Sequence, residues 1–162
     1  MIELVPMSEA EFTAYTAESI PEYARDKVRS CQWAEDKALE LSRQGFEEML
    51  PQGLATPDNH LFTLRVADSA GAVGMLWFAV QERAGEKVAY VYDIGILAQH
   101  QRRGYATEAL AALEGEARSR GLAGIGLHVF GHNPGARALY EKLGYEATNI
   151  NMFKRVARTN ER

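Results

Sequence analysis

The sequence predicts a single α/β domain in which a mixed, mostly antiparallel sheet of six to seven strands is flanked by about four helices. In the first fifty residues apolar side chains recur at helical spacing, and in the following stretch they recur at every second residue. Helical and strand patterns then alternate to the end of the chain, without an internal repeat, linker or low-complexity segment. The 162 residues are enough for one hydrophobic core.

The first fifty residues predict one short strand and two helical regions. Residues 2–7 alternate weakly as a strand, and Ser8-Glu9-Ala10-Glu11 fits a capping box that begins a helix. Ser19-Ile20-Pro21-Glu22 is a second such pattern, so we expect this helix to kink or restart at the proline. Residues 34–50 form the second helical pattern, which Pro51-Gln52-Gly53 ends.

Three strands joined by short loops come next. In residues 62–66 apolar side chains alternate with polar ones, which predicts a half-buried strand. Residues 73–81 and 88–97 are more continuously apolar. Because only short turns separate the three, we expect an antiparallel meander.

The last third of the chain predicts two helices and two strands. One apolar face marks a helix over 106–117 that Gly121 ends, and residues 125–129 alternate as a strand. A second helix runs from Asn133-Pro134 to Gly144. Residues 145–156 are expected to close the sheet, so that residues 1–157 form the domain and 158–162 a frayed tail.

The composition excludes several classes of protein. No apolar run approaches the roughly 18 residues of a membrane span. The acidic N-terminus lacks a basic region followed by an apolar stretch, so we expect no secretory signal and a cytoplasmic protein. Cys31 is the single cysteine, which leaves no internal disulfide or thiolate zinc cluster. The net charge of −4 argues against a general nucleic-acid partner.

Charge is unevenly distributed along the chain. Residues 1–60 carry 5 basic and 12 acidic side chains, whereas residues 101–162 carry 10 basic and 6 acidic ones. Such a chain can offer a cation site and an anion site separately, although solvated surface charge explains the same numbers. The acidic part includes Glu35, Asp36 and Asp58, in and around the second helical region and the loop that follows it.

The stretch Ile94-Gly95-Ile96-Leu97-Ala98-Gln99-His100-Gln101-Arg102-Arg103-Gly104-Tyr105-Ala106-Thr107 suits an anion site. An apolar strand ends here, and a loop with two arginines leads into a helix. The free N–H groups and the dipole of a helix N-terminus favour a pyrophosphate, and Gly104 lets the backbone approach it closely. The stretch is neither a P-loop nor a G-x-G-x-x-G motif. By itself it also fits an ordinary arginine-rich helix start.

A second motif makes the assignment more specific. Gln101-Arg102-Arg103-Gly104-Tyr105-Ala106 fits the Q/R-x-x-G-x-G/A signature of the GNAT N-acetyltransferase superfamily, and the sequence from Asn133 to Tyr145 fits the family's N-x-x-A-x-x-L-Y-x-x-L-G-Y pattern. The clear match covers residues 88–146, and the preceding element order fits as well. The chain therefore resembles GNAT enzymes, and its first sixty residues are similar to small bacterial members whose substrate is not settled.

The resemblance implies that acetyl-CoA lies between the splayed strands 88–97 and 124–130. The backbone of Ile94, Gly95 and Ile96 would pair with the pantetheine arm. The pyrophosphate would be held by the loop residues Gln101, Arg102, Arg103, Gly104, Tyr105, Ala106 and Thr107. Asn133 would contact the cofactor arm. The implied reaction is direct attack of a primary amine within a ternary complex, in a monomer or a homodimer, without a metal or a membrane. In this family the first sixty residues would supply much of the acceptor side, so their acidic balance predicts a cationic acceptor, with Glu35, Asp36 and Asp58 as candidate contributors.

Three residues are candidates for the chemistry. Tyr140 matches the residue that protonates the departing thiolate in the family, although a tyrosine in this pattern can also simply pack in the core. Asp93 is the one carboxylate on its strand and matches an acidic position of polyamine-type members, while a structural aspartate is the alternative. His128 can relay a proton near neutral pH or be an ordinary strand histidine. The four histidines lack metal-ligand spacing.

Two functions from different classes fit these motifs. The first is an acetyl-CoA-dependent N-acetyltransferase acting on a small-molecule or peptide-borne amine. The alternative is a catalytically silent acyl-CoA-binding module that senses the cofactor. Tyr140 and the intact loop 101–107 favour the enzyme. A phosphate-loop kinase is disfavoured because its lysine and metal-binding carboxylates are absent from the sequence.

Overall fold

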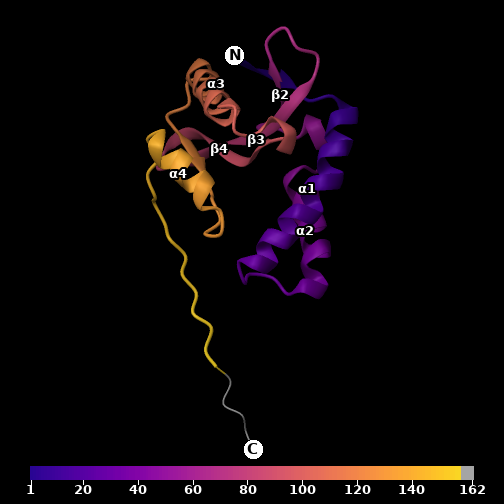
Figure 1. Cartoon of the computed structure of the whole chain (residues 1–162), viewed down its shortest axis with the longest axis vertical. Helices are drawn as coiled ribbons and strands as arrows, with labels where there is room; N and C mark the ends of the chain where they lie inside the picture. The colour runs from indigo at the N-terminus through magenta and orange to yellow at the C-terminus, as the bar shows by residue number, and fades with distance from the viewer. Residues whose placement is uncertain (158–162) are drawn as a thin grey trace, which may run out of the picture.

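One five-stranded sheet organises the chain in this computed structural model, which describes residues 1–157 (Figure 1). Its strands lie in the order β1 (Ile2–Pro6), β2 (Asn59–Val66), β3 (Ala72–Arg83), β4 (Glu86–Ile96) and β5 (Ile125–Leu127). Neighbouring strands are antiparallel from β1 to β4, and β5 is parallel to β4. The predicted mixed, mostly antiparallel sheet is confirmed, but the predicted six to seven strands are too many.

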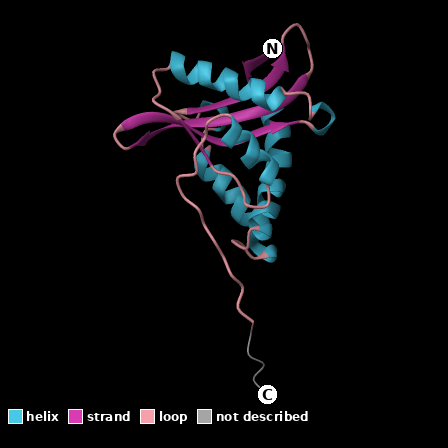
Figure 2. Ribbon diagram, turned by 60° about the vertical axis from the view of Figure 1, so that its left-hand side comes forward, coloured by secondary structure: helices cyan, strands magenta, loops and turns pink. Residues whose placement is uncertain are grey.

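Four α-helices in the described part of the chain cover both faces of this sheet (Figure 2). They are α1 (Glu9–Arg29), α2 (Glu35–Met49), α3 (Tyr105–Ser119) and α4 (Pro134–Lys142). Two short 3₁₀ helices, Gly53–Ala55 and Ala98–His100, lie in the connections. No helix within residues 1–157 has the length and apolar character needed to cross a membrane.

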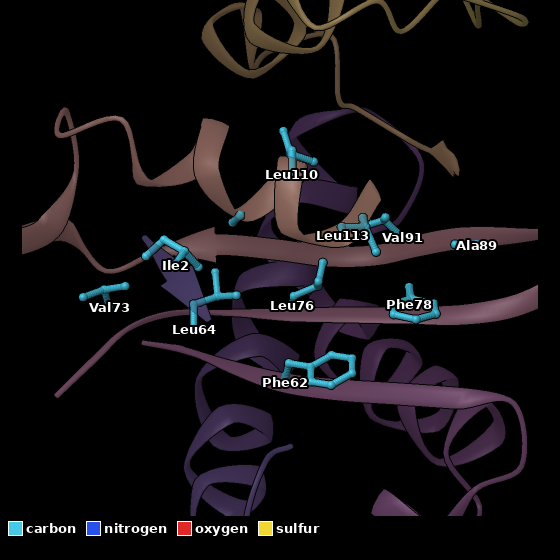
Figure 3. Close-up of a cluster of buried hydrophobic side chains, with 11 residues drawn as sticks. Ile2, Phe62, Leu64, Val73, Leu76, Phe78, Ala89, Val91, Leu110 and Leu113 are labelled. Atoms are coloured by element: carbon cyan, nitrogen blue, oxygen red, sulfur yellow. The ribbon is translucent and has the colours of Figure 1, made fainter. Parts of the chain in front are cut away.

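The hydrophobic core consists of two clusters, one on each face of the sheet. Leu110 and Leu113 of α3 pack with Leu76 and Phe78 of β3 on one face (Figure 3). Trp77, between those two strand residues, packs with α1 and α2 on the other face. Because both faces are covered, the expectation that residues 62–66 form a half-buried strand is wrong: even Thr63, on the polar side of the pattern, is buried.

Pro21 does not restart the first helix. The helix α1 is continuous through Pro21 over 21 residues, with Ser8 and Glu11 forming the predicted capping box at its start. Proline removes one backbone hydrogen bond and crowds the preceding turn, which normally bends or ends a helix. Here the Ser42 hydroxyl of α2 donates a 2.7 Å hydrogen bond to the Ile20 carbonyl. This bond joins α2 to the residue before the proline, and α1 stays continuous there.

The predicted strand over 145–156 is not formed among the described residues. Residues 146–157 are exposed and leave the body of the molecule as an extended chain (Figure 1). A strand needs a partner for its backbone, and none of residues 1–157 pairs with this segment. The predicted tail 158–162 lies outside the described residues.

The sheet separates between β4 and β5, as the family resemblance implied. Residues Ala89–Val91 of β4 pair with Ile125–Leu127, and the pairing stops there. Beyond Val91, β4 continues to Ile96 and stays paired with β3. Within residues 1–157, no strand lies beside its other edge over residues 92–96. This splay positions the site described next.

Candidate active site

A cavity of about 460 Å³ lies at the splay. Its walls come from α1, α2, β3, β4, the chain after β5, and α4. Five residues predicted from the sequence line it, namely Asp93, Ile94, His128, Asn133 and Tyr140. The first and last of them, Asp93 and Tyr140, are 47 positions apart in the sequence. The five come from three separate segments, so the fold brings them together.

Asp93 is the most perturbed acid in this cavity. Burial raises the pKa of its carboxyl to about 6, and the negative charges of Glu22 and Asp26 act in the same direction. The Tyr15 hydroxyl donates a 2.9 Å hydrogen bond to Asp93 Oδ2, which partly offsets this rise. A carboxyl with a pKa near 6 is ionised at neutral pH and still basic enough to accept a proton.

Tyr15 is a site residue that the sequence analysis missed. Its pKa is raised well above 10, first by burial and then by Asp93, so that the hydroxyl remains a donor. Tyr15 lies on the face of α1 that packs against Phe46 of α2. The sequence does contain a signal, because Tyr15, Ser19, Glu22 and Asp26 recur at three- and four-residue steps on one side of the helix.

A register shift in the sheet orients Asp93. Trp77 of β3 pairs with Asp93, whereas Phe78 pairs with Val91, so Tyr92 is an extra residue in β4. An extra residue of this kind bends a strand and redirects the side chains on either side of it. With this bulge, the Asp93 carboxyl reaches Tyr15 of α1, and the ring of Tyr92 lies 4.8 Å from that of Trp77 on the same face of the sheet.

Tyr140 reaches the same cavity from the middle of α4. The N-cap of this helix is Asn133, whose Oδ1 accepts a hydrogen bond from the Ala136 amide at 3.2 Å. Burial, followed by the charge of Asp93, raises the pKa of the Tyr140 phenol. The phenol is thus protonated at neutral pH, as an acid that gives up its proton in a reaction must be.

The two histidines of this region differ in environment. His128 lines the cavity, and burial together with the nearby charge of Lys27 lowers its pKa, so the ring is neutral at pH 7. His132 lies outside the lining and contacts Asp26 Oδ1 at 2.8 Å through Nε2. This contact ties the loop before α4 to α1.

The acidic residues predicted to receive the acceptor are in the wrong place. Glu35 and Asp36 lie exposed in the first turn of α2, and Asp58 lies in the turn before β2; none lines the cavity. Glu22 and Asp26 of α1 line it instead. Charge counts along the sequence do not show which of these two groups of acidic residues lines the cavity. That depends on which face of each helix packs against the sheet.

Aromatic side chains form much of the remaining wall. The cavity is lined by Tyr23, Phe46, Trp77, Tyr90, Tyr92 and Phe130. The ring centroids of Tyr23, in α1, and Phe130, in the chain after β5, lie 6.3 Å apart. A wall of this kind can hold the apolar part of a ligand and attract a cation to its ring faces.

The loop 101–107 lies at the N-terminus of α3. Gln101 Nε2 donates a 3.0 Å hydrogen bond to the Ile96 carbonyl, which holds the loop against the end of β4. Gly104 is the N-cap, with φ of 82°, and no side chain caps the helix. Arg102 and Arg103 are exposed, and no ion pair of theirs occurs among residues 1–157. The first-turn N–H groups of α3 are therefore open to an anion.

The arrangement does not suggest a metal centre. Within residues 1–157, no group of three or more His, Cys, Asp or Glu side chains is placed to hold a metal ion. The cavity holds a basic carboxylate and a protonated phenol, and the exposed N-terminus of α3 follows the end of β4 outside the cavity lining. Such a set can move protons at a reacting centre and bind a phosphate-bearing co-substrate.

Comparisons with known proteins identify the family. Residues 20–145 match the model of the acetyltransferase (GNAT) family. The chain is 39% identical over 155 residues to a Bacillus subtilis protein named "uncharacterized N-acetyltransferase YycN", covering 96% of this chain and 99% of that protein. A second B. subtilis protein, named "uncharacterized N-acetyltransferase YdgE", is 36% identical over 153 residues, covering 94% and 97%.

Solved structures give the same result for the fold. The crystal structure of B. subtilis YycN matches with a TM-score of 0.93 and covers 98% of this chain and 100% of that one. AAC(6')-Iy in complex with the bisubstrate analogue CoA-S-monomethyl-acetylneamine matches with a TM-score of 0.60 at 16% identity, covering 98% and 99%, which indicates a common fold alone. The chain belongs to the GNAT acetyltransferase family and is a transferase of the acyltransferase class.

Proposed function

We propose that this protein transfers an acetyl group from acetyl-CoA to a primary amine, by direct attack within a ternary complex. The observation that carries the proposal is the presence of Asp93 and Tyr140 in one cavity at the splay of β4 and β5. The two groups have opposite protonation states at neutral pH, because the pKa of Asp93 is about 6 and that of Tyr140 is raised above its ordinary value near 10. They therefore suit the roles of base and acid.

Each residue has a defined proton to move. Acetyl-CoA supplies the acetyl thioester. Asp93 accepts a proton from the substrate ammonium, so that the free amine can form the new C–N bond. Tyr140 gives its phenolic proton to the sulfur as the C–S bond breaks. The nitrogen carries a positive charge once the C–N bond has formed, and it loses its second proton as the amide forms. That proton restores the Tyr140 phenol, and Asp93 releases the proton it gained to water, so one proton is set free in each turnover. His128 is the second candidate for accepting the amine proton, since its neutral ring lines the same cavity.

The residues at the splay fit the co-substrate. In the described part of the chain, no strand lies beside the edge of β4 over Ile94, Gly95 and Ile96, which leaves backbone groups for the pantetheine arm. The loop from Gln101 to Thr107 offers open N–H groups and the two exposed arginines to the pyrophosphate. Asn133 lies on the opposite wall, at the start of α4.

The acceptor that this cavity favours is a cationic amine. Glu22 and Asp26 line it together with Asp93, and Tyr23 and Phe130 add aromatic faces. Carboxylates lining a partly enclosed cavity raise the local concentration of cations, and aromatic rings stabilise an ammonium group. One basic residue, Lys27, also lines it, but its ammonium donates to Gln32 Oε1 at 2.8 Å and lies over Tyr23 and Trp33.

A direct assay tests the proposed function. Thiol release from acetyl-CoA is measured over a panel of polyamines, aminoglycosides, amino acids and peptides with free amines, and product masses confirm N-acetylation. The melting temperature is recorded with and without acetyl-CoA. Turnover with cationic amines is the expected result. A rise in melting temperature without turnover on any amine would instead indicate a cofactor-sensing module.

Substitution of Gly104 tests the co-substrate site. Gly104→Glu should raise the dissociation constant of acetyl-CoA by about tenfold or more, because it places a carboxylate beside the proposed pyrophosphate site and a side chain in a left-handed backbone conformation. An added Cβ meets no atom within 4 Å, so the fold should tolerate the change. Titration calorimetry with acetyl-CoA measures the effect.

Gly104→Gln is the matched control for charge. It has the same size and backbone strain but no charge, so it should bind acetyl-CoA more tightly than Gly104→Glu does. Equal affinities in the two variants would attribute the loss to strain alone, and wild-type affinity in both would remove the assigned phosphate site.

A second substitution tests the charge of the acceptor. Glu22→Gln should raise the KM of the best cationic amine severalfold with little change in kcat, because the carboxylate attracts the substrate without contacting the reacting bond. Added salt should raise the wild-type KM and affect the variant less. Glu35→Gln, on the exposed side of α2, is the control and should leave KM unchanged. A neutral best acceptor with a salt-independent KM contradicts this assignment.

A further inference from the structure

The loop between β5 and α4, residues 128–133, forms part of the wall of the active-site cavity. Two side-chain contacts join it to α1. The ring centroids of Phe130 and Tyr23 lie 6.3 Å apart, and His132 Nε2 lies 2.8 Å from Asp26 Oδ1. Asp26 lines the cavity and His132 does not, so His132 binds this carboxylate from outside the cavity.

The Asp26–His132 contact is partly shielded from water. The side chains of His132 and Asp26 are 18% and 36% exposed. A carboxylate oxygen only accepts hydrogen bonds, so the ring nitrogen Nε2 is the donor. The ring also stacks on Phe130, with 5.1 Å between the centroids and 15° between the planes. Because a hydrogen bond to a carboxylate is stronger than one between neutral groups, this contact holds the stacked pair of rings beside α1.

Short-range hydrogen bonds connect this loop to α4. The Asn133 amide donates to the Phe130 carbonyl at 2.9 Å. Asn133 Oδ1 accepts from the Ala136 amide at 3.2 Å, which makes Asn133 the N-cap of the helix. Tyr140 lies about two helical turns beyond this N-cap. A displacement of His132 therefore moves Asn133 and, through the helix, Tyr140.

The Asp26–His132 contact joins the two sides of the proposed site. Helix α1 contributes Glu22 and Asp26 to the side assigned to the amine. The loop and α4 contribute Asn133 and Tyr140 to the side assigned to acetyl-CoA. Within residues 1–157, no other contact at ion-pair distance links α1 to this loop or to α4.

We propose that His132 is a positioning residue. By binding Asp26 it holds residues 128–133 and the start of α4 in the position that binds acetyl-CoA and places the Tyr140 phenol at the sulfur. The inference rests on the proposed function, because that function assigns Asn133 and Tyr140 to the co-substrate. Without the contact the loop occupies several positions, and only a fraction of the molecules has Asn133 in the binding position. The apparent affinity for acetyl-CoA is reduced by that fraction.

A double-mutant cycle, measured by titration calorimetry with acetyl-CoA, tests the proposal. His132→Ala should raise the dissociation constant about fivefold or more in the wild-type background. It should have almost no effect in the Asp26→Ala background, because the contact is then already absent. Glu22→Ala is the matched control background. It removes a carboxylate from the same side of the cavity without removing the contact, so the effect of His132→Ala should persist there in full. Because His132 and Asp26 are partly exposed, the fold should tolerate their substitution.

A conservative substitution and hydrogen exchange distinguish positioning from a general loss of structure. His132→Gln keeps an N–H donor at the end of its side chain, so its acetyl-CoA dissociation constant should stay within about twofold of the wild-type value. In the free protein, backbone amides of residues 128–140 should exchange faster in His132→Ala than in the wild type, whereas those of β2 should not change.

The possible failures are distinguishable. Wild-type affinity for acetyl-CoA in His132→Ala overturns the proposal and leaves the proposed function intact. A loss that is equally large in the Asp26→Ala background, or faster exchange in β2 as well, also overturns it. A His132→Gln variant that binds as weakly as His132→Ala assigns the effect to stacking on Phe130 and overturns the role of Asp26. A wild-type protein that does not bind acetyl-CoA overturns the proposed function, and this inference with it.

Discussion

Tyr140→Phe is expected to lower kcat by about 10²- to 10⁴-fold while leaving the acetyl-CoA dissociation constant nearly unchanged. The substitution removes one oxygen from a side chain that lines the cavity and packs against the core through its ring. Only the proton that the phenol gives to the departing sulfur is lost. Since a thiolate is a good leaving group, the loss can fall at the lower end of this range. Steady-state kinetics and calorimetry with acetyl-CoA measure the two quantities.

Tyr145→Phe is the matched control for this prediction. Tyr145 packs beside Tyr140, with 5.7 Å between ring centroids, and it does not line the active-site cavity. Its hydroxyl is buried and has no hydrogen-bond partner within the described residues, so its removal should not affect kcat. Full activity of Tyr140→Phe would make Tyr140 a packing residue and would leave water as the source of the proton.

Asp93→Asn is expected to lower kcat/KM for the amine by about 10²-fold or more and to remove the acidic limb of the pH–rate profile. The pKa of Asp93 is about 6, so in the wild-type enzyme the base is ionised above pH 6 and activity falls as the pH drops through that value. Asparagine has no such titration, and the remaining activity should follow the ionisation of the amine alone. An unaltered profile would transfer the role to His128 or to water.

Tyr15→Phe tests whether the hydrogen bond to Asp93 sets the pH dependence of the reaction. The Tyr15 hydroxyl donates to Asp93 Oδ2 and lowers the pKa of that carboxyl, so its removal should move the acidic limb above pH 6. A merely structural role of Tyr15 would reduce activity without moving the limb. The combination of the two variants should behave as Asp93→Asn alone, because no carboxyl is left to respond.

The Asp93 carboxyl also makes the free energy of unfolding depend on pH. Folding raises the pKa of Asp93 from 3.8 to about 6, so the folded state binds this proton more tightly than the unfolded one. The associated stability is fully present below pH 3.8 and is lost as the pH rises through 6. At pH 8, Asp93→Asn should therefore raise the free energy of unfolding by up to about 3 kcal/mol relative to the wild type. Thermal unfolding of both proteins at pH 5 and pH 8 checks this difference.

Local patterns in the sequence predicted the features whose causes are local. The capping box at Ser8, the end of the helix before Gly121 and the N-cap at Asn133 each depend on residues within one helical turn, and all three are confirmed. The loop from Gln101 to Thr107 was also found in this way, because its glycine and arginines lie next to the helix they begin. Family membership followed from two such motifs in the right order, and the comparisons confirm it.

The sequence by itself thus determined the fold class, the family and the segments that carry Asp93 and Tyr140. Only the tertiary structure decided which acidic side chains lie near Asp93 and Tyr140. Glu22 and Asp26 are the same residue types as Glu35 and Asp36, and they differ in lining the cavity. It also decided that α1 passes through Pro21, where the Ser42 hydroxyl binds the Ile20 carbonyl from another helix. Residues 145–156 have the alternation of a strand but no partner among residues 1–157. Side-chain periodicity is a local property of one segment. The face that a helix buries, the continuity of a helix through a proline and the pairing of a strand each depend on a second segment, which a local pattern does not specify.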